Sequence, residues 1–160
     1  MFKTEDYYHV DYLGEAGITE TCLFSLHNLV QTHADLSYAL LLTSEQSHAF
    51  ILKDLTENYY MIRAGFTSGY FGEGPKGLAI ALSLLKRHQI ETEEILVSTK
   101  LLNKLNSSSL SDHDIDFIFQ QKIIRPIRLH DYIYPFESEV AQTIKLKRYY
   151  PLELPYSIID

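Results

Sequence analysis

Apolar residues recur at helical spacing in the middle of the chain, directly after a glycine-rich segment. They stand at positions i, i+3, i+4 and i+7 of one helix face: Leu78, Ala81, Leu82 and Leu85. Pro75 is a residue type favoured at the first position of a helix, and Gly74 before it can act as the N-cap. The pattern predicts a largely buried helix that begins at Pro75 and anchors the glycine-rich loop to the core.

Shorter patterns predict a helix and three strands on the N-terminal side of this segment. Thr19 is placed to cap a helix from about Glu20 to His33. Three apolar runs separated by polar turns predict consecutive strands: Tyr38–Leu42, His48–Leu52 and Tyr59–Arg63. These spacings favour an antiparallel meander over repeated βαβ units, and residues 1–17 are expected to be an irregular or extended lead-in.

On the C-terminal side of this segment, the sequence pattern predicts one more strand around Ile95–Val97 and two short helices. Ser98 or Thr99 can cap the first helix. Ser111 and Asp114 have the spacing of a capping box for the second, although Glu or Gln is more usual at the latter position. Residues 127–160, which carry prolines and tyrosines, are expected to be extended.

Together these elements predict one α+β domain over residues 1–160, with an antiparallel sheet packed on a central buried helix and shorter helices beside it. Hydrophobic residues make up 46% of the chain and charged residues 22%, which argues against disorder. The single cysteine, Cys22, is expected to be a buried apolar residue, and it excludes an internal disulfide. Neither a membrane span nor a signal peptide is indicated, so a cytoplasmic location is expected.

Negative charge is concentrated in the first 60 residues, where nine acids against two lysines give a net charge of −7. The other 100 residues carry twelve charges of each sign. Nucleic acid is therefore an unlikely partner for the first part of the chain. An acidic face can attract a basic protein partner, although solubilising charge explains the same residues.

Gly72–Gly77 reads G-E-G-P-K-G, a G-x-G-x-x-G placed between a predicted strand and a predicted helix. Backbone amides at a helix N-terminus, together with Lys76, can hold a phosphate. Pro75 removes one of these amides, however, and Glu73 adds a competing carboxylate. A tight loop that uses glycine for positive φ and close packing explains the same letters.

Residues 125–132 read R-P-I-R-L-H-D-Y and form the densest mixed polar cluster. Strand alternation would place Arg128 and His130 on one face, as in an anion-contacting pair, although exposed strand charges are equally consistent. Six residues are therefore candidates for ligand binding: Gly72, Gly74, Lys76, Gly77, Arg125 and Arg128. No metal and no cofactor are expected, because Asp112–Asp116 lacks the further residues of an EF-hand and no histidine pair has ligand spacing.

Residues 69–82, G-Y-F-G-E-G-P-K-G-L-A-I-A-L, resemble a signature of a small uncharacterised family found in bacteria and their phages. That signature reads W-G-Y-G-G-S-G-P-x-x-L-A-x-A-L. This chain has Ser68 in place of the tryptophan and Glu73 in place of the serine. The family has no activity to carry over, so the resemblance implies a bacterial or phage source more than a function.

Two functions follow as hypotheses. The favoured one is a non-enzymatic binding protein of bacterial or phage origin, either immunity-like or accessory, that meets a protein partner through its acidic, tyrosine-bearing surface. The alternative is a small nucleotide- or phosphate-ligand protein, with or without enzymatic activity, that uses Gly72–Gly77 together with Arg125 and Arg128. An open pocket beside the glycine loop that contains those basic groups would favour the alternative.

Overall fold

The computed structural model describes residues 8–147, and side-chain surroundings up to Ile144. Its five strands form one sheet in the order β1-β4-β3-β2-β5. Their bounds are β1 (His9–Leu13), β2 (Leu36–Ser44), β3 (Ser47–Asp54), β4 (Asn58–Thr67) and β5 (Glu91–Leu96). The predicted α+β class is confirmed, and so is the antiparallel meander, which is made by β2, β3 and β4.

The sheet is mixed rather than antiparallel throughout, because β1 runs parallel to β4 and β5 runs parallel to β2. The cause is the pair of helical connections, α1 (Thr19–Thr32) after β1 and α2 (Glu73–Arg87) after β4. A helix that crosses over a sheet returns the chain to the end at which the preceding strand began, so the next strand runs parallel to it. Both edge strands are joined to the meander in this way.

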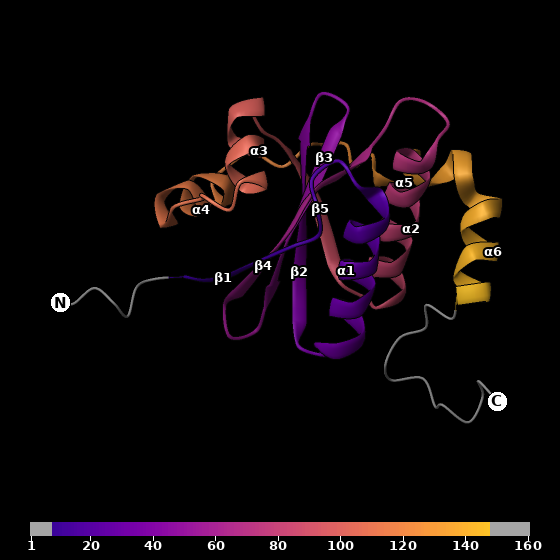
Figure 1. Ribbon diagram of the computed structural model, residues 1–160, viewed down its shortest axis with the longest axis horizontal. Coiled ribbons are helices and arrows are strands. Elements are labelled where there is room, and N and C mark those ends of the chain that lie inside the picture. The colour runs from indigo at the N-terminus through magenta and orange to yellow at the C-terminus, as the bar shows by residue number, and fades with distance from the viewer. Residues whose placement is uncertain (1–7, 148–160) are drawn as a thin grey trace.

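Helices cover both faces of the sheet (Figure 1). On one face lie α1 and α2, and on the other lie α3 (Thr99–Asn106) and α4 (Asp112–Phe119). Alternate residues of the central strands therefore enter two different cores. Phe50 and Leu52 of β3 pack with α1 and α2, whereas Ala49 and Ile51 pack with α3 and α4. Burial on both faces explains why these strands read as continuous apolar runs.

The predicted central helix is confirmed as α2, and ten of its fifteen residues are buried. It begins at Glu73, with Gly72 as the N-cap in place of Gly74. Pro75 is tolerated in the first turn because the first four N–H groups of a helix have no intrahelical acceptor. A third apolar cluster, formed by residues of α2 that do not face the sheet, includes Phe136, Val140 and Ile144, and Leu23 of α1 packs against it. That second layer is why apolar residues such as Ala79, Ile80 and Leu84 also occur outside the predicted apolar face of α2.

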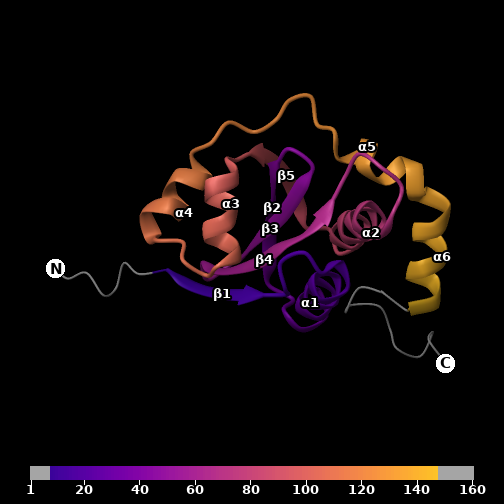
Figure 2. The same cartoon turned by 45° about the horizontal axis from the view of Figure 1, so that its top comes forward.

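The prediction that residues 127–160 are extended is wrong for the residues that the structure describes. It forms α5 (Leu129–Ile133), a 3₁₀ turn η2 (Tyr134–Phe136) and α6 (Glu137–Lys147). The segment after α4 crosses one end of the sheet and brings these helices to the outer side of α2 (Figure 2). Phe136, Val140 and Ile144 recur every four residues, which is a helical spacing that the neighbouring proline and tyrosines concealed. Residues 148–160 lie outside the described part.

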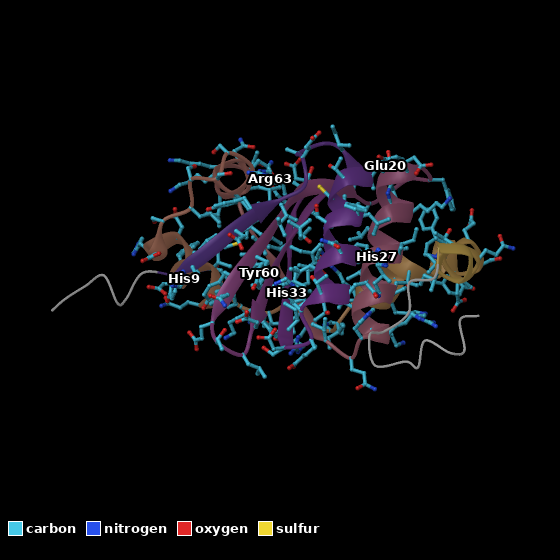
Figure 3. All side chains as sticks on the ribbon, turned by 60° about the horizontal axis from the view of Figure 1, so that its bottom comes forward. His9, Glu20, His27, His33, Tyr60 and Arg63 are labelled. Atoms are coloured by element: carbon cyan, nitrogen blue, oxygen red, sulfur yellow. The ribbon has the colours of Figure 1, made fainter. Side chains whose placement is uncertain are left out.

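Figure 3 shows α1 from another side of the molecule, and there His27 of α1 and His33, the residue after its last turn, lie in different surroundings. His33 packs edge-on against Tyr60 of β4, with ring centroids 5.1 Å apart. His27, six positions earlier, lies toward α2 (Figure 3). The two histidines therefore have different neighbours. Cys22 of the same helix is buried, which is also as expected.

The predicted capping box at Ser111 is present at the start of α4. The Ser111 hydroxyl accepts from the Asp114 backbone N–H at 3.0 Å, and the Asp114 carboxylate accepts from the Ser111 N–H at 2.9 Å. Ser111→Ala removes one of these bonds and should lower the free energy of unfolding by about 1 kcal/mol. Urea denaturation measures this, with Ser138→Ala, at an exposed serine of α6, as the control. An unchanged midpoint for Ser111→Ala would contradict the role of the cap.

Candidate functional site

An open hollow of about 530 Å³ lies between the β4–α2 loop and the C-terminal helices. Its wall is mostly aromatic or apolar and comes from both segments: Tyr70, Phe71, Pro75 and Leu78 on one side, Tyr132, Pro135 and Phe136 on the other. Phe71 contacts Phe136 with ring centroids 5.3 Å apart, yet Phe71 remains 79% exposed. We call this site the aromatic hollow.

A buried carboxylate organises the polar groups behind the aromatic hollow. Glu94 of β5 is only 3% exposed, and its two oxygens accept from Nε and Nη2 of Arg128 at 2.9 and 3.1 Å. The Tyr132 hydroxyl donates to Oε2 at 2.6 Å, and the Thr43 hydroxyl donates to the same oxygen at 2.5 Å. Burial alone would raise the pKa of Glu94, but these donors lower it below its ordinary value. Glu94 is therefore ionised at neutral pH.

A chain of hydrogen bonds leads from Glu94 to the hollow through a buried histidine. Thr43 Oγ1 lies 2.8 Å from His48 Nδ1, and His48 Nε2 lies 2.8 Å from Ser68 Oγ. The proton order in this chain is fixed. The single hydroxyl proton of Thr43 goes to the Glu94 carboxylate, so Thr43 must accept from an N–H at His48 Nδ1. Nε2 then carries a lone pair, and the Ser68 hydroxyl donates to it.

His48 has no exposed surface. Burial lowers its pKa to about 4, and the positive charge of Arg128 acts in the same direction, while Glu94 opposes them. The imidazole is consequently neutral at neutral pH. The ring of Tyr132 packs against it, with centroids 5.2 Å apart, so α5 closes the histidine off from solvent.

The structure brings some of the predicted ligand-binding residues to this hollow and places others elsewhere. Arg128 lines it, as does Pro75 next to Gly74. Arg125 instead pairs with Glu93 through Nη2 and Oε2 at 2.8 Å. The prediction that Arg128 and His130 share one face of a strand is wrong. Helix α5 begins at Leu129, and the alternation of a strand does not apply to a helix.

Lys76 and Gly77 line a different hollow, on the α1 side of α2, together with Glu20 and Glu73. Lys76 therefore does not share a pocket with Arg128, and acidic groups are its neighbours. The anion-binding role of the six candidate residues stays a prediction.

Two of the candidate glycines lie where α2 approaches its neighbours most closely. A Cβ atom at Gly74 would overlap Thr67 Oγ1 of β4, and one at Gly77 would overlap Thr19 Cγ2 of α1. Thr19, which was expected to cap α1, is its first helical residue, and its hydroxyl donates to the Gly65 carbonyl at 2.6 Å. Close packing thus supplies a structural reason for Gly74 and Gly77.

This contact at Gly77 can be tested with a double-mutant cycle. Gly77→Ala should lower the free energy of unfolding by about 1–2 kcal/mol, because overpacking outweighs the better helix propensity of alanine. Thr19→Ser removes the obstructing methyl group and keeps the hydroxyl. In that background Gly77→Ala should be neutral or stabilising by up to about 1 kcal/mol. Equal costs in both backgrounds, measured by urea denaturation, would refute the contact.

Sequence reasoning missed the residues at the centre of the site, His48, Ser68 and Glu94. One usable signal was present. Thr43 and His48 flank the polar turn between β2 and β3 and are cross-strand partners in that hairpin. Pairing the two predicted strands across this turn would have brought these polar side chains together. No comparable signal connects them with Ser68 or Glu94, which arrive from distant segments.

Comparison with known proteins gives one informative result. No protein-family model matches the chain, and no curated protein matches it. A chain in a solved structure of respiratory complex I from Thermus thermophilus has a similar fold, with a TM-score of 0.60 and 16% identity. The alignment covers 76% of this chain and 98% of that chain. The likeness shows a shared fold.

Two further features concern residues 8–147. None of the helices there has the length and apolar character needed to cross a bilayer. Within the same residues, no group of three or more His, Cys, Asp or Glu side chains is placed to hold a metal ion.

Proposed function

We propose that this protein is a binding protein whose protein partner inserts a short segment into the aromatic hollow. The observation that carries the proposal is the exposure of large rings around an open apolar depression. Phe71 is 79% exposed and Tyr70 is 53% exposed, and both line the hollow. Clustered exposed aromatic side chains are typical of recognition surfaces, where they anchor a partner.

The charges around the hollow indicate the chemistry of that segment. Glu45 and Asp131 line it, while the guanidinium of Arg128 is already bonded to Glu94. An apolar side chain next to a lysine or arginine fits this combination. The net charge of −7 would also steer a basic partner toward the protein at low salt.

One observation outside the hollow supports this function. The similar solved chain comes from a protein complex, which is compatible with use of this fold as one component of an assembly. The bacterial or phage origin, and an immunity-like or accessory role, rest on the short resemblance at residues 69–82.

The test is selection of a displayed library of random short peptides on the full chain. We expect selected peptides to combine an apolar residue with a neighbouring lysine or arginine. Phe71→Ser should weaken their binding by about tenfold or more, since anchor residues of this kind contribute upwards of about 1.4 kcal/mol. Their association rate should fall as salt rises.

Phe24→Ser is the matched control, because Phe24 is an aromatic residue of α1 that is 67% exposed and lies outside the aromatic hollow. It should leave peptide binding unchanged. Peptides that bind the Phe71→Ser variant as tightly as the parent chain would contradict the proposal, and so would a selection that enriches no peptide.

The alternative, an anionic ligand at Gly72–Gly77, is kept because Arg128 and the first turn of α2 line the same hollow. A phosphate-bearing ligand there should raise the melting temperature of the parent chain, and Arg128→Gln should reduce the shift. Lys76→Ala should leave the shift unchanged, because Lys76 lines a separate hollow. If inorganic phosphate, nucleotides and sugar phosphates all fail to shift the parent chain, the alternative is excluded.

A further inference from the structure

The aromatic hollow contains a serine whose hydroxyl is held by a buried, neutral histidine. Ser68 follows the last residue of β4, lines the hollow and is partly buried. Within the described residues its Oγ bonds only His48 Nε2, at 2.8 Å. Because Ser68 donates this bond, both lone pairs of Oγ are left for another atom.

The groups behind His48 hold it in the tautomer that a general base needs. Thr43 accepts from Nδ1 at 2.8 Å and passes its own proton to Glu94 at 2.5 Å. The carboxylate is fixed in turn by Arg128 and Tyr132. A nucleophile bonded to a base, with the base oriented by a third group, is the arrangement that activates serine in acyl transfer.

We propose that Ser68 is an acyl-accepting nucleophile and that the aromatic hollow hydrolyses small carboxylic esters with an apolar acyl group. The inference goes beyond the binding function and does not depend on it. Ser68 and His48 are the catalytic residues, whereas Thr43 and Glu94 are positioning residues that orient His48. The acyl group would lie against the apolar part of the wall, which includes Pro75, Leu78 and Phe136.

The reaction balances with water as the only co-reactant. Ser68 Oγ attacks the ester carbonyl carbon while its proton moves to His48 Nε2. The bond from that carbon to the alkoxide oxygen breaks, and the alkoxide takes the proton from His48. Water then attacks the acyl-serine with His48 again accepting a proton, and this proton returns to Ser68 Oγ as the carboxylic acid leaves.

Donors for the oxygen that becomes negative are close in sequence. The backbone N–H groups of Gly69 and Tyr70 directly follow Ser68, and neither bonds an acceptor in the described part of the chain. Such free N–H groups stabilise the charge that develops on a carbonyl oxygen. Because burial lowers the pKa of His48 to about 4, the base is weak and turnover should be slow.

The first test is covalent labelling of the full chain with an alkyl fluorophosphonate, whose phosphorus bonds to an activated serine as fluoride leaves. We expect a single label, mapped to Ser68 by mass spectrometry. Hydrolysis of p-nitrophenyl butyrate should also exceed the rate in buffer. Ser68→Ala should abolish both results, while Ser109→Ala, at an exposed serine in the loop after α3, should preserve them.

The pH dependence supplies a readout that a purely structural histidine would not give. The labelling rate should be constant through about pH 6.5, where an ordinary histidine titrates, and should fall near pH 4 as His48 Nε2 takes up a proton. His48→Gln, checked for folding by circular dichroism, should reduce the rate at least tenfold. If this variant does not fold, the fall in the labelling rate of the parent chain near pH 4, measured where circular dichroism shows it still folded, decides the matter.

Three outcomes would overturn the proposal. They are a folded parent chain that takes no label, a label that persists in Ser68→Ala, and a folded His48→Gln variant that is labelled as fast as the parent chain. Peptide binding is measured separately on the parent chain, so a parent chain that binds the selected peptides but takes no label contradicts this inference and leaves the binding function standing.

Discussion

Leu85→Asp is expected to leave little or no folded protein. Leu85 has no exposed surface and lies in the core shared by α1, α2 and the sheet. An aspartate there would lose its hydration without gaining a partner, which costs about 4 kcal/mol or more. Small proteins have a total stability of only about 5–15 kcal/mol, so the variant should unfold or aggregate. Soluble yield and far-UV circular dichroism measure the effect.

Lys86→Asp is the matched control for this change. It introduces the same side chain at the next position of α2, where the native residue is exposed. Reversing a charge in the last turn opposes the helix dipole and should cost only a few tenths of a kcal/mol to about 1 kcal/mol. If Leu85→Asp folds with a denaturation midpoint close to that of Lys86→Asp, α2 is not the central layer of the core.

Elements that depend only on neighbouring residues could be predicted from the sequence, and those that depend on distant segments could not. The apolar stripe of α2 and the strands of the meander are local patterns, and both are present. The parallel pairing of β1 and β5 with the meander is not local. It depends on where α1 and α2 return the chain, and a period-two pattern does not contain that information.

The candidate site was less predictable for the same reason. Its groups come from β2, β3, the end of β4, β5 and α5, and each is an ordinary polar residue in its own segment. Arg128 was predicted to be a site residue, but on a strand face that does not exist. Lys76 was grouped with it because the two sides of α2 cannot be assigned until the positions of α1 and α5 are known.

Acid should destabilise the protein well before most of its carboxylates are protonated, because of His48. Its pKa is about 4 in the folded chain and about 6.5 when unfolded. Below pH 6.5 the unfolded chain therefore binds a proton that the folded chain does not, and stability falls as the pH falls. The loss should reach about 3 kcal/mol near pH 4 and then level off, at about 1.36 kcal/mol per pKa unit.

Two other groups have to be separated from this effect. Asp54 accepts from Asn58 and Thr56, and these bonds lower its pKa to about 2 in spite of its burial. The stability that it contributes is present above its ordinary pKa of 3.8 and is lost as the pH falls toward 2, which is a lower window. Burial also lowers the pKa of His27, so His27 acts in the same direction as His48.

The experiment is a series of urea denaturations between pH 6.5 and pH 4, with the parent chain, His48→Gln and His27→Gln compared. His48→Gln will be less stable at neutral pH, since it disturbs the bonds to Thr43 and Ser68, but most of the pH dependence should disappear. His27→Gln should keep most of the pH dependence. A parent chain whose stability is constant over this range would show that His48 takes up a proton inside the folded structure. His48 Nε2–H would then donate to Ser68 Oγ, while the bonds from His48 to Thr43 and from Thr43 to Glu94 would keep their direction.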